Sequence, residues 1–267
     1  MNVVVEGLRI AYNGTPVVRD VSLRVESGEL VTIVGPNGSG KTTLLRGMSR
    51  LVRPEGGRVL IGGDDIRKLS AREVARRLAI LPQLPKTADD ITVRELVWRG
   101  RYPHQGLLQR ATATDAEAVA WAVAATDTAG LVGRQLGSLS GGERQRAWIA
   151  LALAQQPDVL LFDEPTSFLD IQHQVEIMRL LRRLSGQGMT IVAVLHDLFL
   201  AGRYADRVIG IKDGQVAFDG PPADVLTPAY LEPVFGVPMM VLPDPATGSP
   251  VPLPRPDPAE AARALIR

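Results

Sequence analysis

The sequence predicts an α/β fold that opens with an antiparallel β subdomain and carries an inserted helical subdomain. In the first thirty residues, short Val-rich runs and the turn sequence NGTP indicate the antiparallel part. The continuous apolar runs LVTIVG, VLLF and TIVAVL alternate with helical segments, which indicates a parallel sheet buried on both faces. From residue 84 to about residue 155 the pattern is helical, so we expect the inserted subdomain there.

Helix starts are marked by capping boxes, in which Ser or Thr precedes Glu by three residues. The matching pairs are Ser70 with Glu73, Thr92 with Glu95, Thr114 with Glu117, and Ser140 with Glu143. Gly100 and Gly130 are expected to end helices. A further helix is expected over 171–184, and its predicted apolar face comprises Ile171, Val175, Met178 and Leu181.

The last third of the chain predicts a hairpin and then an irregular tail. The stretch RVIGIKDGQVAF is typical of two strands that turn at Asp213 and Gly214. Beyond Gly236 the chain is rich in proline, which favours extended or irregular backbone.

Composition narrows the classes of function. The chain has 267 residues, a formal net charge of +1 and no cysteine. The lack of cysteine excludes disulfides and thiolate zinc sites and suits a reducing cytoplasm. Because the net charge is small and aromatics are sparse, we expect no nucleic-acid partner. The N-terminus lacks a secretory signal, and the apolar runs are too short to cross a bilayer, so any work at a membrane should go through a partner.

Residues 35–42, GPNGSGKT, match the pattern of a phosphate-binding loop between an expected strand and a helix that starts at about Lys41. The glycines allow successive backbone N–H groups to converge on phosphate oxygens, and the helix N-terminus adds a favourable dipole. Lys41 is expected to reach the β- and γ-phosphates, while the Thr42 hydroxyl is expected to ligate Mg²⁺.

The run VLLFDEP provides two carboxylates, Asp163 and Glu164, at the end of a buried strand. In α/β sheets, ligands bind beyond this end of the strands. Asp163 is expected to hold the magnesium, directly or through water, and Glu164 to orient and deprotonate an attacking water.

Isolated polar residues carry weaker signals. Gln83 and His196 each follow an expected strand. At these positions Gln83 could contact Mg²⁺ or the attacking water, and His196 could contact a γ-phosphate. His104 and His173 form no metal-ligand spacing, and we expect His173 on a helix surface.

Taken in order, these motifs resemble the ATP-binding subunits of ABC transporters, over a span from Tyr12 to about Pro254. The resemblance implies a P-loop NTPase core with ATP and Mg²⁺ as ligands, a catalytic role for Glu164, and an adenine-stacking role for Tyr12. It assigns phosphate binding to Gly35, Pro36, Asn37, Gly38, Ser39, Gly40, Lys41, Thr42 and Thr43. Gln83 matches the family's Q-loop, His196 its switch histidine, and Ser167–Asp170 its D-loop, which ends in Asp170.

The stretch LSGGERQ matches the family's signature and explains two glycines in a first helical turn, where most residues have better helix propensity. In this family two copies sandwich ATP head to tail, so the signature faces the ATP of the other copy. The residues that match are Ser140, Gly141, Gly142, Glu143 and Gln145. Bare backbone at the glycines allows a close approach to phosphate. The resemblance therefore implies a homodimer.

The resemblance also predicts the organisation and setting of the chain. Residues 1–240 are expected to form the ATP-binding domain, with the helical subdomain at about 84–155, and residues 241–267 a proline-rich tail. We expect a membrane permease to dock near Arg99–Leu108, on the cytoplasmic face of the inner membrane, and a periplasmic or surface substrate-binding protein to act indirectly.

Within the family, GRYPHQGLL, SFLDIQHQVEIMRLL and VFGVPMMVLPDPATGSPVPLP resemble the iron(III)-siderophore importers, which are close to the haem and cobalamin branches. Siderophore import is the preferred interpretation, and haem or cobalamin import is the alternative. A soluble ABC ATPase of DNA repair or translation is less favoured, because the chain has one phosphate loop, no heptad tract and no cysteine. A nucleotide-binding module without turnover is also disfavoured, because Glu164 is intact.

Overall fold

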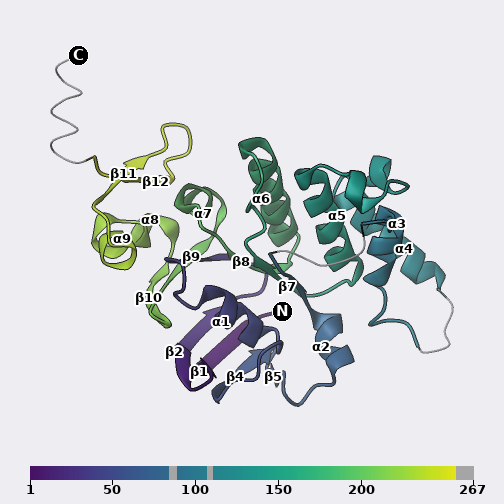
Figure 1. The fold of residues 1–267 in the computed structure, drawn as a ribbon, viewed down its shortest axis with the longest axis horizontal. Helices are drawn as coiled ribbons and strands as arrows, with labels where there is room; N and C mark the ends of the chain where they lie inside the picture. The colour runs from purple at the N-terminus through teal and green to yellow at the C-terminus, as the bar shows by residue number, and fades with distance from the viewer. Residues whose placement is uncertain (84–88, 107–110, 257–267) are drawn as a thin grey trace.

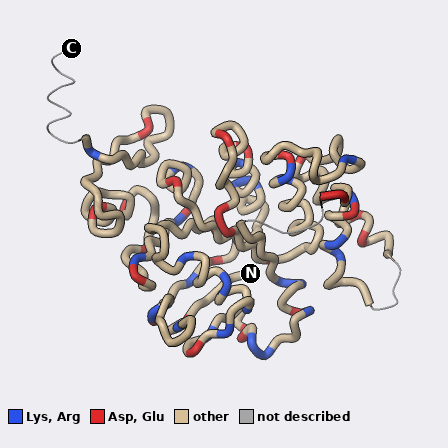
Figure 2. The backbone as a smooth tube through the Cα atoms, viewed as in Figure 1, with Lys and Arg blue, Asp and Glu red and all other residues tan. Residues whose placement is uncertain are grey.

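The structure, a computed structural model, describes residues 1–83, 89–106 and 111–256. Within these residues, the strands form a six-stranded sheet, a four-stranded antiparallel sheet and a two-stranded hairpin. The six-stranded sheet lies at the centre of Figure 1, with the four-stranded sheet below it and the inserted helices at the right. Basic and acidic residues are interspersed along the chain (Figure 2). The α/β fold with an antiparallel β part and inserted helices, predicted from the sequence, is confirmed.

The central sheet is parallel except at one edge, where β10 pairs antiparallel with β9. In spatial order its strands are β10 (Gln215–Gly220), β9 (Arg207–Lys212), β3 (Leu30–Val34), β8 (Thr190–Val194), β7 (Val159–Asp163) and β6 (Leu78–Leu81). Along β3, Leu30 and Val34 pack into one hydrophobic core while Val31 and Ile33 pack into the other. The continuous apolar runs therefore arise because these strands are covered on both faces.

The four-stranded sheet closes one of these two cores. Its strands, in spatial order, are β2 (Thr15–Val25), β1 (Val3–Tyr12), β4 (Gly56–Ile61) and β5 (Asp64–Asp65). Helix α1 (Lys41–Met48) packs in the same core through Leu44, Leu45 and Met48. The antiparallel sheet and α1 together hold the loop between β3 and α1 in place.

Helix α2 (Ala71–Arg77) packs through Val74 into the core that the four-stranded sheet closes. The other face of the central sheet carries the helices α3 (Val93–Arg99), α4 (Ala113–Ala125), α5 (Gly141–Ala154), α6 (Ile171–Gly186) and α7 (Leu198–Tyr204), with short 3₁₀ turns at Ala129–Leu131 and Leu136–Ser138. Helices α3, α4 and α5 share a hydrophobic core with α6. Among the described residues, none of the helices combines the length and apolar character that crossing a bilayer requires.

Two expected helix ends were wrong, and both errors concern α4. The N-cap is Thr112, whose Oγ1 accepts a hydrogen bond from the Asp115 backbone at 3.2 Å, and not Thr114. Asp in place of Glu completes this capping box. The helix ends before Thr126, whose hydroxyl donates to the Ala122 carbonyl at 2.9 Å, and not at Gly130.

The predicted apolar face of α6 was wrong at its first residue. Ile171 is 79% exposed, whereas Met178 and Leu181 are fully buried. Ile171 is the residue after the N-cap, where the helix projects beyond the core that its later turns contact.

The proline-rich region after Gly236 is extended, as expected, but it is also paired. Strands β11 (Met239–Pro243) and β12 (Pro250–Pro254) form an antiparallel hairpin that follows α8 (Pro222–Val225) and α9 (Pro228–Phe235). The hairpin packs on α7, where a Cβ on Gly202 would lie 2.6 Å from the Pro250 carbonyl oxygen. Strand β11 therefore crosses the boundary between residues 240 and 241, where the tail was expected to begin.

A buried ion pair fixes the segment that follows α3. Arg101 Nε donates to Asp115 Oδ1 at 2.8 Å, and the two side chains are 3% and 6% exposed. Arg101 also donates to the Ala154 carbonyl at 2.7 Å and to Gln156 Oε1 at 2.9 Å. A backbone hydrogen bond from Thr112, with further help from Arg101, lowers the pKa of Asp115 to about 2. Arg101 thus ties α4 and the end of α5 to the expected docking segment.

We expect Arg101→Met to lower the free energy of unfolding by about 3 kcal/mol at pH 7, because it leaves Asp115 buried without its cation. Denaturant unfolding measures the change. Arg24→Met is the matched control, because its ion pair with Glu26 is exposed and contributes about 1 kcal/mol or less.

The difference in the free energy of unfolding between wild type and Arg101→Met should become smaller as the pH falls from about 4 toward 2. Protonation of Asp115 in this range removes the charge that Arg101 neutralises. Equal losses in the two variants at pH 7 would contradict this account of the pair.

Candidate functional site

The loop at residues 35–40 lies between β3 and α1, and two of its glycines approach neighbouring backbone more closely than any other residue permits. Gly35 has φ +150°, and a Cβ there would lie 2.1 Å from the Ile211 carbonyl oxygen. Gly40 has φ +102°, and a Cβ there would lie 2.7 Å from the Val17 carbonyl oxygen. The neighbouring strands therefore require glycine at both positions, independently of any ligand.

Lys41 is buried at the first position of α1. Its Nζ donates to the carbonyl oxygens of Gly35 and Pro36, each at 2.8 Å. Burial lowers the pKa of Lys41, while the nearby carboxylates of Glu164 and Asp163 oppose that shift. The ammonium group of Lys41 thus binds the carbonyl oxygens of the same loop that would bind a phosphate group.

Thr42 and Asp163 bring the two sequence motifs into direct contact. The Thr42 hydroxyl donates to Asp163 Oδ1 at 2.8 Å. Asp163 is buried at the end of β7, and burial raises the pKa of its carboxyl group, with the Thr42 hydrogen bond opposing the rise. A hydroxyl and a carboxylate side by side are oxygen ligands of the kind that Mg²⁺ prefers.

A hollow of about 180 Å³ lies over the loop. It is lined by Val17, Asn37, Gly38, Gly40, Lys41, Thr42, Thr43, Glu164 and His196. Beside it, the Ser39 hydroxyl is buried without a hydrogen-bond partner among the described residues. Backbone amides, an ammonium group and an unpaired hydroxyl at one place fit a polyanion such as a triphosphate.

Glu164 is the point at which three other segments meet. Its carboxylate is hydrogen-bonded by Gln83 Nε2, by His196 Nε2, and by the Ser167 hydroxyl at 2.8 Å. Its backbone has φ +56°, the left-handed region, which places it in a sharp turn after β7. The structure brings together Gln83, Glu164 and His196, which the sequence singled out separately.

Sequence reasoning missed two residues of this site. Ser167 was expected only as part of the D-loop, but its hydroxyl contacts Glu164 directly. Val17, on β2, lines the hollow through a strand that carries no motif. The spacing of Ser167 three residues after Glu164 is a usable signal, whereas nothing local marks Val17.

The signature residues lie at the start of α5, outside the lining of the hollow. The Ser140 hydroxyl caps the helix by accepting a hydrogen bond from the Glu143 backbone N–H at 3.2 Å, and Glu143 Oε2 accepts one from the Ser140 N–H at 2.9 Å. Gly141 is exposed, but Gly142 is buried. Gln145 is half-buried one turn further along the helix.

Asp170 and Tyr12 also lie away from the hollow. Asp170 is the N-cap of α6, and its Oδ1 accepts from the His173 backbone at 2.9 Å and from His173 Nδ1 at 2.7 Å. Tyr12 is exposed at the end of β1, paired with Thr15. His173, expected on a helix surface, lies partly exposed on α6 and also packs against Gly142.

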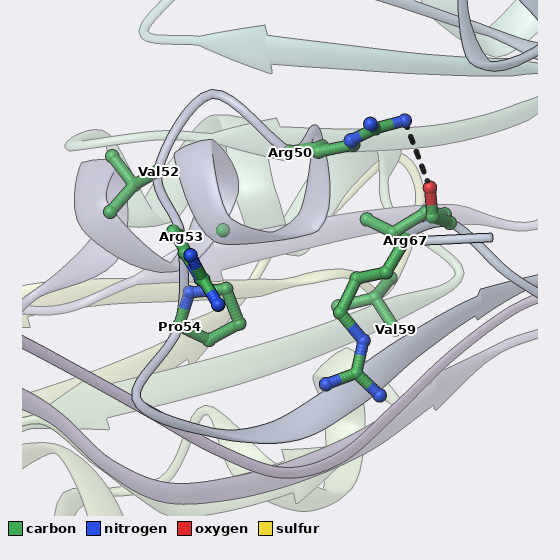
Figure 3. Close-up of a pocket in the computed structure, with 8 residues that line it drawn as sticks. Arg50, Val52, Arg53, Pro54, Val59 and Arg67 are labelled. Carbon is green, nitrogen blue, oxygen red and sulfur yellow. Dashed lines mark hydrogen bonds between the residues drawn. The ribbon is translucent and has the colours of Figure 1, made fainter. Parts of the chain in front are cut away.

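A second hollow, of about 390 Å³, lies where the end of α1 faces β4 (Figure 3). It is larger than the hollow over the loop but contains none of residues 35–43. Of the arginines at its rim, Arg50 donates to the Ile66 carbonyl at 3.2 Å and Arg67 pairs with Asp65 at 2.7 Å. Size alone therefore does not identify the functional site, since two of these guanidinium groups are used by the fold.

Comparisons with known proteins agree with the geometry. Residues 18–167 match the family described as ABC transporter. The ferric enterobactin transport ATP-binding protein FepC of Escherichia coli is 44% identical, over 96% of this chain and 96% of its own length. The cobalamin import ATP-binding protein BtuD of Halobacterium salinarum is 43% identical, over 98% of this chain and 66% of its own length.

A solved structure extends the likeness to the fold. The ATP-binding cassette MJ0796, determined as a dimer in a post-hydrolysis state with ADP and Pi, superposes with a TM-score of 0.72 at 28% identity. The match covers 82% of this chain and 98% of that one.

We expect Lys41→Ala to weaken ATP binding by about 10- to 100-fold, because a charge-assisted contact to phosphate is lost. Titration with a fluorescent ATP analogue measures the dissociation constant. Lys68→Ala removes an exposed lysine outside the hollow and is the matched control. Unchanged affinity in Lys41→Ala would count against the assignment of the loop.

Proposed function

Because the chain belongs to the ABC transporter family, we propose that it is the ATP-hydrolysing subunit of an importer for iron(III)-siderophore complexes. The observation that supports a siderophore as the cargo is the match to a ferric enterobactin transport protein over 96% of both chains. Cobalamin is the second candidate, and it is less favoured because the cobalamin relative is matched over only 66% of its length.

ATP binds with its phosphates over the loop at residues 35–43. The backbone amides and the N-terminus of α1 face the phosphates, and Lys41 exchanges its bonds to Gly35 and Pro36 for bonds to phosphate oxygens. The unpaired Ser39 hydroxyl supports this assignment, because a phosphate oxygen gives it a partner. Tyr12 is the proposed stacking partner of the adenine.

Mg²⁺ is the cofactor that fits the donor set. Thr42 and Asp163 would hold it, with Gln83 as a further oxygen ligand. Among the described residues no group of three or more His, Cys, Asp or Glu could hold a metal ion alone, which agrees with an ion that also relies on phosphate oxygens and water. When bound, Mg²⁺ neutralises charge on the phosphates.

Glu164 is the proposed general base. Glu164 lines the hollow together with Lys41 and Thr43, so its carboxylate faces the space in which a triphosphate and its attacking water would lie. Gln83 and Ser167 both donate to Glu164 Oε2, whereas His196 bonds to Oε1 and leaves a second acceptor site there for the attacking water. On ATP binding, His196 exchanges its bond to Glu164 for one to the γ-phosphate.

The site is completed by a second copy of the chain. The signature residues Ser140, Gly141, Gly142, Glu143 and Gln145 lie outside the hollow of their own chain. We assign them to the ATP of the partner copy, with Asp170 at the same interface. The dimeric state of the related cassette supports this arrangement.

Coupling to transport requires partners that the chain itself does not provide. We assign permease docking to Arg99–Leu108, of which Leu107 and Leu108 lie outside the described residues. The described part is held firmly, since the Pro103 carbonyl accepts from Arg72 at 2.8 Å and Arg76 at 2.9 Å. The subunit would act on the cytoplasmic face of the membrane, with a substrate-binding protein on the other side.

We expect Glu164→Gln to retain ATP binding while turnover falls by roughly 10²-fold or more, since a positioned general base contributes an effect of that order. Steady-state phosphate release and nucleotide titration provide the two readouts. Glu117→Gln makes the same chemical change at an exposed position of α4 and should leave both unchanged. Normal turnover in Glu164→Gln would remove this residue from the mechanism.

The cargo is tested by cellular uptake of iron-labelled siderophores, haem and cobalamin in cells that carry wild type or Glu164→Gln. Selective loss of ferric siderophore uptake in the variant is the expected result. Loss of haem or cobalamin uptake instead would support an importer but refute a siderophore as its cargo. No change in the uptake of any of the three would refute the proposed role in transport.

A further inference from the structure

The start of α5 rests on the start of α6, and the contact is between Gly142 and the ring of His173. A Cβ on Gly142 would lie 1.9 Å from Cδ2, 2.4 Å from Cγ and 2.6 Å from Nε2 of His173. No methyl group fits at these distances. Gly142 is therefore required by its own chain, before any ATP or second copy is considered.

The ring cannot move aside freely, because Asp170 holds it. His173 Nδ1 lies 2.7 Å from Asp170 Oδ1, the same oxygen that accepts from the His173 backbone at 2.9 Å. The backbone bond alone caps α6, so the bond to the ring is additional to capping. A ring that left Gly142 would also give up this bond to Asp170.

Neighbouring contacts extend the interface between the starts of α5 and α6. Leu169 Cδ2 would lie 3.3 Å from a Cβ on Gly141, an approach closer than ordinary packing distances. One turn further on, Arg146 Nη1 pairs with Glu176 Oε2 at 3.2 Å. Helix α5 belongs to the inserted helical part, whereas α6 follows the strand that carries Asp163. His173 thus lies between the two parts of the fold.

We propose that His173 is a positioning residue for ATP hydrolysis, which joins Asp170 and the glycines of the signature into one unit. This role rests on the proposed function, in which the signature contacts the nucleotide held by the partner copy and Asp170 lies at the same interface. Asp170 is 66% exposed and Gly141 is exposed, so both are accessible to a second copy, while His173 is 25% exposed and lies between them. Through His173, a displacement of the signature helix is transmitted to Asp170.

A double-mutant cycle on Gly142 and His173 tests whether their contact matters for hydrolysis. Gly142→Ala should lower kcat about tenfold, because its methyl group displaces the ring and breaks the bond to Asp170. His173→Ala should lower kcat by a similar factor, because the same bond is missing. In Gly142→Ala with His173→Ala the methyl group meets no ring, so the combined loss of kcat should be clearly smaller than the product of the two single losses.

His173→Asn is the conservative variant, because its amide N–H lies near the position of Nδ1 and can still donate to Asp170. It should retain kcat within about threefold of wild type while His173→Ala does not. All variants should bind ATP as single chains with unchanged affinity, because neither residue lines the hollow over the loop. Thermal unfolding of each variant separates a loss of fold from a loss of positioning.

Additive losses in the cycle would overturn the proposal, because they would mean that Gly142 serves only the approach of the partner's phosphate. Equal losses in His173→Asn and His173→Ala would also overturn it, because the bond to Asp170 would then be irrelevant. A wild-type chain without ATPase activity would refute the proposed function itself, which distinguishes that failure from the failure of His173.

Discussion

The position of β8 between β3 and β7 is the constraint on which the site depends. Val194, the last residue of β8, is paired with Ile33 on one side and with Asp163 on the other. This register brings the ends of three strands to one edge, so the phosphate loop, the carboxylate pair and His196 emerge together. A shift of one residue in β7 would turn Asp163 to the opposite face and separate it from Thr42.

The same edge holds charged groups in surroundings that disfavour charge. Burial lowers the pKa of Lys41 and raises that of Asp163, and each is partly compensated by the other and by polar partners. The carboxylate of Glu164 is occupied by three side chains from separate segments. The hydrogen bonds of Lys41, Thr42 and Glu164 in the free chain therefore mark atoms that ATP, water and metal would contact, because each of these groups has a partner that a ligand can replace.

Much of this arrangement was predictable because the informative residues are close in sequence. The phosphate loop, the carboxylates after VLLF and the capping boxes at Ser70, Thr92 and Ser140 each rely on local spacing, and the structure contains each of these elements. The prediction failed at α4 because Asp115 serves as well as Glu in a capping box.

The contacts that were not predictable join residues far apart in the chain. No sequence signal near Gly142 predicts its contact with the ring of His173, and none near Val17 predicts that it lines the hollow over the loop. The hairpin of β11 and β12 was missed for a different reason. Proline removes the donors that mark a strand, yet it is tolerated in this hairpin, whose outer edges pair with no other strand in the part of the chain that the structure describes.

The claim that each nucleotide site is shared by two copies is tested most directly by mixing two inactive variants and measuring ATP hydrolysis. Lys41→Ala damages the phosphate loop, and Gly141→Trp blocks the exposed start of the signature helix. A mixed dimer contains one site with both defects and one site with neither. The account predicts that activity returns on mixing, well above the sum of the two variants alone. Activity equal to that sum would mean that no intact site forms between the two copies, and would contradict the account.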